Sequence, residues 1–389
     1  MSAGTAEDAG DLVLVSSSGR NGGTLLLRLL DACPRLWVHP IDVVYLTAWD
    51  DLAGRGELSY DTRRGLGRKP LTNLDRPLSA AALREEFGRH WVDIDEWYVP
   101  LLVEPLERGP DPQTLIAGDG DDDQYEVDRF LPAFLRATRA AYGPRRRDEP
   151  DAYVFKSVET AYVEEWVRLF PAIRCLHLVR DPVTNWASVK RSWSYHQAHP
   201  FYFGGRDVLR DFVERRWLPQ AAAALRLSRH DPRRHRIVRY EDLTHEPGRT
   251  IAEICAWLAT PPPEPHEELT SLGGRRMTAM PVEPRPSKPG IAAPVTIVPD
   301  MAARYSYDEV VSDRERALLA ATIGSVTEAL GYGSPAPGLP GRLLLLGRWL
   351  PVDASERLHV RSRLRWLWEL ARRRAWIARV VVRPPGASA

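Results

Sequence analysis

Short apolar runs alternate with amphipathic stretches along most of the chain. Runs of strand length occupy residues 12–15, 153–156, 173–179 and 235–240. Helical periodicity is found over residues 24–31, 161–170, 206–229, 247–258 and 313–330, and Asp181 with Pro182 is a typical helix start. Because strands that alternate with helices form parallel sheets covered on their faces, the pattern predicts an α/β fold with a parallel β-sheet flanked by helices.

The pattern also indicates how the chain is organised. Between residues 42 and 149 it weakens, and Gly-, Arg- and Asp-rich turns interrupt it, so we expect inserted helices and loops there. Residues 260–290 are rich in proline and glycine and are expected to form a long loop. We therefore predict one domain over residues 1–335, with the 42–149 insertion shaping a substrate pocket, and a basic helical extension over residues 336–389.

The composition is that of a globular protein, with 44% hydrophobic and 27% charged residues. The net charge is only +1, which does not favour nucleic acid as a partner. The three cysteines form no CxxC pair, so neither a zinc site nor a disulfide framework is indicated. The N-terminus lacks a signal-peptide pattern and no apolar run approaches the length of a membrane span, so we expect a cytoplasmic protein.

One strand-to-helix junction has the residues of an anion site. The apolar run at 12–15 leads into the loop SSSGRNGGT at residues 16–24, and an apolar helix follows. Backbone N–H groups, a helix N-terminus and the Arg20 cation would converge there, an arrangement that binds phosphate or sulfate. The loop lacks the lysine of a Walker A motif and the glycine spacing of a dinucleotide fingerprint. The alternative is a tight turn whose glycines permit positive φ.

Polar residues also stand at the carboxyl ends of the other predicted strands. Lys156, Arg180 and Tyr240 occupy these positions, and Ser188 lies about two helical turns after Arg180. Ligands of open α/β sheets bind at the carboxyl ends of the strands. Arg180 and Ser188 are therefore candidates for a second phosphate, with Tyr240 beside it. The alternative for Arg180 is an ion pair with Asp181 or with a neighbouring loop.

Taken together, these segments resemble the sulfotransferase family. The sequence GRNGGTLL at residues 19–26 is similar to the family's 5′-phosphosulfate loop, P-[KR]-S-G-T-T-x-L. The sequence LVRDP at residues 178–182, with Ser188, resembles the 3′-phosphate motif, and RYEDL at residues 239–243 resembles the Y-E-D-L element. The three segments occur in the family's order. Gly19, Asn21 and Gly23 stand where the family pattern has proline, serine and threonine.

The resemblance implies a P-loop-like sulfotransferase architecture and metal-independent transfer of a sulfuryl group. The donor would be 3′-phosphoadenosine 5′-phosphosulfate (PAPS), and the acceptor a hydroxyl or amine of a small molecule or glycan. Arg20 matches the cation at the 5′-phosphosulfate, Arg180 and Ser188 match the 3′-phosphate clamp, and Lys288 loosely matches a basic loop above it. The implied donor-binding residues are Gly19, Arg20, Asn21, Gly22, Gly23, Thr24, Arg180, Ser188, Tyr240 and Lys288.

The chemistry needs cations at the leaving group and a base at the acceptor. Arg20 and the loop N–H groups can stabilise charge on the bridging oxygen, and Lys156 can place a second cation at the sulfuryl group. Cytosolic small-molecule members of the family carry a K-T-H triplet whose histidine is the base. The matching residues 156–158 here are KSV, so that histidine is missing. Asp42 and His39 are the candidate bases, although Asp42 can equally cap a helix and His39 can be a packed loop residue. Glu159 and the acidic stretch at 119–123 are further candidates.

The C-terminal extension carries 11 arginines against three acidic residues. Its stretch at 357–382 mixes tryptophans with arginines, a composition that suits a membrane surface or a partner protein. The preferred interpretation is a helix docked on the domain, with a peripheral membrane contact as the alternative.

Two other functions remain open from the sequence. A nucleotide-dependent kinase of P-loop type would share the sheet and the anion loop, but the Lys-Ser/Thr pair that holds phosphate and Mg²⁺ is missing. A binding protein that keeps the fold without catalysis is compatible with the altered loop.

Overall fold

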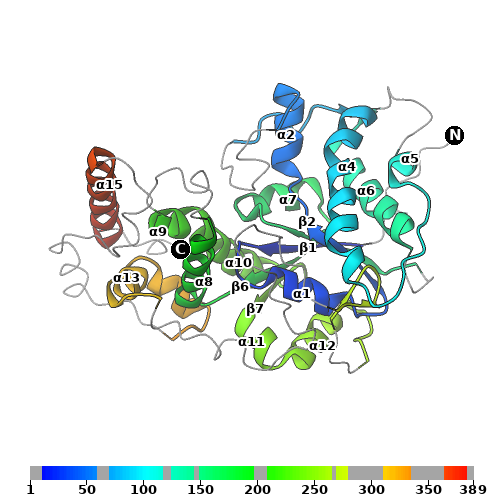
Figure 1. The fold of residues 1–389 in the computed structure, drawn as a ribbon. Coiled ribbons are helices and arrows are strands. Elements are labelled where there is room, and N and C mark those ends of the chain that lie inside the picture. Colours follow the sequence, from blue (N-terminus) through cyan, green and yellow to red (C-terminus); the bar gives the residue numbers. More distant parts are fainter. Residues whose placement is uncertain are drawn as a thin grey trace.

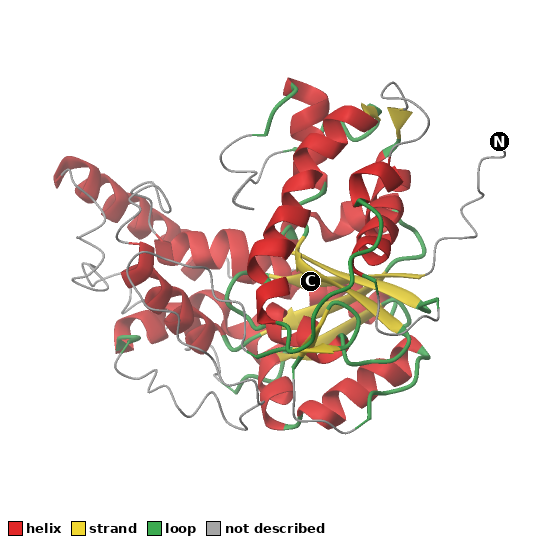
Figure 2. Cartoon of the chain, turned by 45° about the vertical axis from the view of Figure 1, so that its right-hand side comes forward, coloured by secondary structure: helices red, strands yellow, loops and turns green. Residues whose placement is uncertain are grey.

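The structure is a computed structural model that describes residues 11–58, 70–116, 124–143, 149–196, 208–264, 269–278, 310–333 and 363–382. Its centre is a five-stranded sheet in the order β2-β5-β1-β6-β7, and every pair of neighbours is parallel (Figures 1 and 2). The strands are β1 (Asp11–Ser17), β2 (Leu36–Asp42), β5 (Ala152–Ser157), β6 (Arg174–Val179) and β7 (His235–Arg239). The predicted α/β fold is therefore confirmed.

Helices cover both faces of this sheet (Figure 2). Because side chains alternate along a strand, Val13 and Val15 face one layer and Leu14 faces the other. The first layer contains α1 (Gly23–Leu30) and α12 (Pro247–Leu258). The second contains helices from the predicted insertion together with α7 (Val163–Leu169). The central strands are covered by helices on both faces, which explains why their sequences are continuous apolar runs.

The sequence pattern did not predict β2, the strand that ends at Asp42. Pro40 interrupts its apolar run, and proline lacks the N–H that a central strand needs. The structure places β2 at the edge of the sheet, where a proline is tolerated, and its register with β5 shifts between Val38 and Asp42. Asp42 is thereby brought opposite Lys156 of β5.

The long helix predicted over residues 206–229 is present over its described part, but it is not a regular α-helix throughout. Its described part comprises α9 (Val208–Asp211), a π-helical segment (Phe212–Trp217) and α10 (Leu218–His230). Pro219 lies in the first turn of α10 and cannot donate the hydrogen bond that would continue a regular helix. The irregular turn places Trp217 so that its indole N–H donates to the Arg180 carbonyl at 2.9 Å.

The remaining described elements surround this framework. Within the predicted insertion lie helices and also one antiparallel pair of two-residue strands that the sequence did not predict: α2 (Leu46–Arg55), α4 (Ala80–Trp97), α5 (Pro112–Ile116), α6 (Val127–Tyr142), β3 (Leu78–Ser79) and β4 (Gln124–Tyr125). Later in the chain are α8 (Pro182–His196), α11 (Tyr240–His245), β8 (Thr270–Ser271), β9 (Arg275–Arg276), α13 (Asp313–Ala329) and α15 (Arg363–Val382). No helix in these described ranges is both long enough and apolar enough to cross a membrane.

Candidate active site

The loop between β1 and α1 has an unusual backbone at two positions. Arg20 has a φ of 71° and Gly22 a φ of 96°, both in the left-handed region. Such a conformation is uncommon for a residue with a Cβ, and backbone strain of this kind tends to cluster at functional sites. Gly22 is the N-cap of α1 and forms no side-chain cap. The first turn of α1 therefore keeps its N–H groups for another acceptor, as the anion-site interpretation requires.

Two loop glycines are needed because neighbouring side chains pass very close to them. A Cβ on Gly22 would lie 2.3 Å from Cδ2 of Tyr240. A Cβ on Gly23 would lie 2.5 Å from Cδ of Lys156 and 2.3 Å from Oγ of Ser17. These distances are too short for any real Cβ contact. The glycine that replaces the family's threonine at position 23 thus makes room for the lysine from β5.

Lys156 extends over this glycine to two polar partners. Its Nζ lies 2.5 Å from Oδ1 of Asp42 and 3.3 Å from Oγ1 of Thr24. Its side chain is 8% exposed, whereas that of Asp42 is 42% exposed. The structure therefore brings together a predicted cation, a predicted base and a residue of the anion loop at the ends of β5 and β2.

His39 is buried in the core, although it is only three residues from the exposed Asp42. Its ring is fully buried, 5.3 Å from the ring of Phe134 and 6.2 Å from that of His90. Its Nδ1 is 3.1 Å from the carbonyl of Ile41. Burial lowers the pKa of His39 to about 3, so the imidazole is neutral. A side chain without exposed surface cannot meet an acceptor, so His39 fits a packed position in the core.

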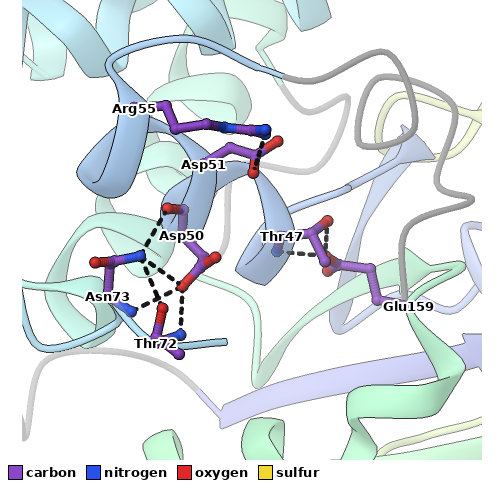
Figure 3. A network of polar contacts seen from close by, with 7 residues as sticks. All are labelled: Thr47, Asp50, Asp51, Arg55, Thr72, Asn73 and Glu159. Atoms are coloured by element: carbon purple, nitrogen blue, oxygen red, sulfur yellow. Dashed lines mark hydrogen bonds and ion pairs between the residues drawn. The ribbon is translucent and has the colours of Figure 1, made fainter. Parts of the chain in front are cut away.

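Glu159, a further candidate base, caps a helix instead. Its carboxylate accepts hydrogen bonds from the backbone N–H groups of Tyr45, Leu46 and Thr47 and from the Thr47 hydroxyl. Figure 3 shows the two bonds from Thr47. These groups form the start of α2, whose orphan donors need an acceptor. Glu159 is only 5% exposed. The same helix is tied to the following segment by Asp50, whose side chain accepts from the N–H groups of Thr72 and Asn73 (Figure 3).

Arg180 connects the anion loop with the end of β6 and the start of α11. Its Nη1 donates to the Arg20 carbonyl at 3.0 Å, and its Nε donates to the Thr184 hydroxyl at 3.1 Å. The guanidinium lies 4.1 Å above the centre of the Tyr240 ring. Ser188 is half-buried one helical turn beyond Thr184, on the same face of α8. The structure thus brings Arg20, Arg180 and Tyr240 together, with Ser188 on the adjoining helix face.

Asn21 turns its side chain into the protein. Its Nδ2 donates to the carbonyl of Leu178 at 2.7 Å, and its Oδ1 accepts from the Ser17 hydroxyl at 2.5 Å. The side chain is buried. Asn21 therefore shapes the loop through its side chain, and a contact with a donor molecule would come from its main chain.

Gln220 of α10 completes this network and was missed by the sequence analysis. Its Oε1 accepts from the Ser18 N–H at 3.1 Å, and its Nε2 donates to the carbonyls of Ser16 at 3.0 Å and Leu178 at 2.7 Å. The side chain is only 2% exposed. One sequence signal could have indicated it: Gln220 is a polar residue on the apolar face of α10, which it shares with Ala221 and Ala224.

Two predicted features cannot be placed. Lys288 and the acidic stretch at 119–123 lie outside the described residues.

The described part of the predicted long loop contains β8 and β9 and contacts the end of α1. Both carboxylate oxygens of Asp31 accept there from the N–H groups of Gly273 and Gly274, at 3.0 and 2.8 Å. Burial raises the pKa of Asp31, and the cation of Arg28 opposes that effect.

A comparison with protein-family models identifies one family. A family model described as "Sulfotransferase family" matches residues 13–264, well over half of the chain. A search of curated proteins finds no match.

Solved sulfotransferases are distant. A sulfotransferase domain from the curacin biosynthetic pathway is 16% identical, with a TM-score of 0.42, over 84% of this chain and 99% of that one. A sulfotransferase from Alicyclobacillus acidocaldarius is 13% identical, with a TM-score of 0.34, over 70% and 86% of the two chains. The sulfotransferase domain of the Synechococcus PCC 7002 olefin synthase is 16% identical, with a TM-score of 0.33, over 64% and 73%. The assignment rests on the family match, which spans the anion loop, the Arg180 segment and Tyr240: the chain belongs to the sulfotransferase family.

Proposed function

We propose that this protein transfers a sulfuryl group from PAPS to a hydroxyl or amine of a small-molecule acceptor. The observation that carries the proposal is the position of Arg180, which contacts the Arg20 carbonyl, α8 and the Tyr240 ring. The Arg180 side chain thereby contacts both the anion loop, proposed for the 5′-phosphosulfate, and helix α8, which carries Ser188 for the 3′-phosphate. The family match supports sulfuryl transfer as the chemistry.

The residues of the site fit such a donor. The uncapped N-terminus of α1 and the left-handed turn at Arg20 and Gly22 offer N–H groups to an anion. Arg180 and Ser188 supply a cation and a hydroxyl for a second phosphate, and the Tyr240 ring lies against the Arg180 guanidinium. When bound, PAPS supplies the sulfuryl group, and 3′,5′-adenosine bisphosphate is the leaving group.

In the proposed reaction the acceptor oxygen or nitrogen bonds to sulfur as the bond from sulfur to the 5′-phosphate oxygen breaks. Arg20 and the first turn of α1 stabilise the charge that develops on the leaving oxygen. Lys156 holds a second cation next to Thr24. Asp42 takes the acceptor proton, since its side chain is well exposed and Lys156 orients one of its oxygens. The positioning of groups carries most of the catalysis, because the protein forms no covalent intermediate.

Thermal unfolding with nucleotides tests the donor class. At a concentration 100 times the Kd, a ligand that binds the folded state adds about 2.7 kcal/mol of stability. We expect 3′,5′-adenosine bisphosphate to raise the Tm strongly and ATP with Mg²⁺ to raise it much less. An equal or larger shift with ATP would favour a kinase. No shift with the bisphosphate would refute PAPS as donor, and binding without turnover of any acceptor would identify a binding protein.

The identity of the acceptor is tested first, and that of the catalytic base second. Mass spectrometry of small-molecule extracts incubated with labelled PAPS, with and without EDTA, identifies the acceptor and tests metal independence. With that acceptor, Asp42→Asn should lower kcat at least a hundredfold and leave bisphosphate binding intact. Asp75→Asn, which changes an exposed carboxylate elsewhere in the same part of the chain, is the control. Unchanged turnover in Asp42→Asn would remove Asp42 from the base role.

A further inference from the structure

The helix α15 docks on the rest of the protein through one face. It lies at the periphery of the molecule beside α13 (Figure 1). Trp376 and Ile377 are 2% and 3% exposed and pack in the cluster that contains Leu318 and Leu319 of α13. Arg373, one turn earlier, is also buried. This face accounts for the docking that the sequence analysis preferred.

The opposite face of the same helix is apolar and exposed. Leu364, Leu367 and Trp368 are 80%, 55% and 56% exposed, and they are half of the strongly exposed large apolar residues in the described ranges. At about 100° per residue, Leu364, Trp368, Ala371 and Ala375 fall within about 60° of one another. Their centre lies roughly 180° from the docked residues. We call Leu364, Leu367, Trp368, Ala371 and Ala375 the outer stripe.

Arginines border the outer stripe on both sides. Arg372 and Arg379 follow one edge and Arg374 the other, and all three are exposed. The Arg372 guanidinium lies 4.4 Å above the centre of the Trp368 ring. The helix as a whole contains six arginines and a single glutamate. An apolar stripe with a tryptophan, bordered by cations, is the arrangement of helices that lie in a membrane interface.

We propose that the outer stripe of α15 rests on the surface of an anionic lipid bilayer, while the docked face holds the catalytic domain against it. Arginines near an anionic surface are attracted to it, and the leucines and tryptophan add apolar burial. Charge also argues against a second copy of the chain as the occupant. Pairing two outer stripes would bring the arginines of both helices together, which is unfavourable. This proposal does not depend on the donor or the acceptor.

Vesicle flotation of the full chain tests the proposal. We expect binding to vesicles of phosphatidylglycerol and phosphatidylcholine in a 3:7 ratio, at least tenfold weaker binding to pure phosphatidylcholine, and a loss of binding at high salt. The triple variant L364S/L367S/W368S should weaken binding to the anionic vesicles at least tenfold. The variant R372Q/R374Q/R379Q should weaken it similarly and reduce its salt dependence.

The matched control is V92S/V103S/L115S, which changes three exposed apolar residues outside α15. It should bind vesicles as the unchanged protein does, and all variants should keep the Tm shift with 3′,5′-adenosine bisphosphate if the proposed function holds. Unchanged vesicle binding in the stripe variant, or no binding by the parent protein, would overturn the membrane proposal alone. A dimer in analytical ultracentrifugation that the stripe variant loses, without vesicle binding, would assign the stripe to a second copy instead.

Discussion

The substitution Gln220→Met removes an amide from the network beneath the anion loop while keeping the length of the side chain. In the unchanged protein this amide accepts from Ser18 N–H and donates to the carbonyls of Ser16 and Leu178. The Leu178 carbonyl also accepts from Asn21 at 2.7 Å, so it keeps a partner in the variant. The Ser18 N–H and the Ser16 carbonyl each lose a bond in a buried position.

The expected magnitude follows from those two groups. A buried polar group that loses its partner costs about 1–3 kcal/mol. Because the loop can relax partly, we expect the free energy of unfolding to fall by about 2–4 kcal/mol. The loss is measured by equilibrium urea unfolding followed by tryptophan fluorescence. We also expect binding of 3′,5′-adenosine bisphosphate to weaken at least tenfold at a temperature where the variant is folded, because the network sets the backbone of the loop.

Gln113→Met provides the matched control. Gln113 is exposed on α5, and its replacement should change the unfolding free energy by no more than about 0.5 kcal/mol. If Gln220→Met behaves like this control in both measurements, the network does not hold the loop. A loss of stability with unchanged nucleotide affinity would show that Gln220 supports the sheet but does not position the site.

Three further predictions concern the same framework. Gly23→Ala should reduce both stability and turnover, because its Cβ would lie 2.5 Å from the neighbouring lysine side chain, whereas Gly19→Ala makes only ordinary contact and should be tolerated; urea unfolding and activity compare the two, and equal effects would refute the steric argument. Arg180→Lys keeps the charge but loses the forked donor, so the Kd of 3′,5′-adenosine bisphosphate by calorimetry should rise at least tenfold. Burial lowers the pKa of His39 and of His177 to about 3, so the unfolded state binds protons that the folded state excludes. The unfolding free energy should therefore be largest above pH 6.5 and fall by up to about 1.4 kcal/mol per pH unit for each histidine as the pH drops toward 3, and equal stability at pH 7 and 5 would contradict this.

The sequence predicts those parts of the molecule that depend on local pattern. The strands at the centre of the sheet and helix α12 lie within a residue or two of their expected bounds. Pro40 concealed β2 because a proline is acceptable only at an edge, and strand order is a property of the whole sheet. The long helix was predicted from its apolar periodicity, which does not reveal the π-helical segment before Pro219.

In the candidate site, too, some residues have a local sequence signal and others depend on how distant segments pack. Arg20, Arg180 and Tyr240 could be predicted because each follows a recognisable strand. Gln220 could not, since its partners Ser18 and Ser16 lie 202 and 204 positions away in the sequence and meet it only after β1, β6 and α10 are packed. The ion pair between Lys156 and Asp42 likewise depends on β2 lying beside β5.

The altered residues of the anion loop are explained by what surrounds them. Gly23 stands where the family has threonine, and any side chain there would overlap Lys156. Asn21 stands where the family has serine, and its longer amide reaches the Leu178 carbonyl. Restoring threonine at position 23 would therefore displace the lysine without rebuilding the family's loop. Because Gly23 lies against Lys156 and Asn21 bonds to the same carbonyl as Gln220, the loop, Lys156 and the amide network are packed together, and a substitution in any one of them should affect the others.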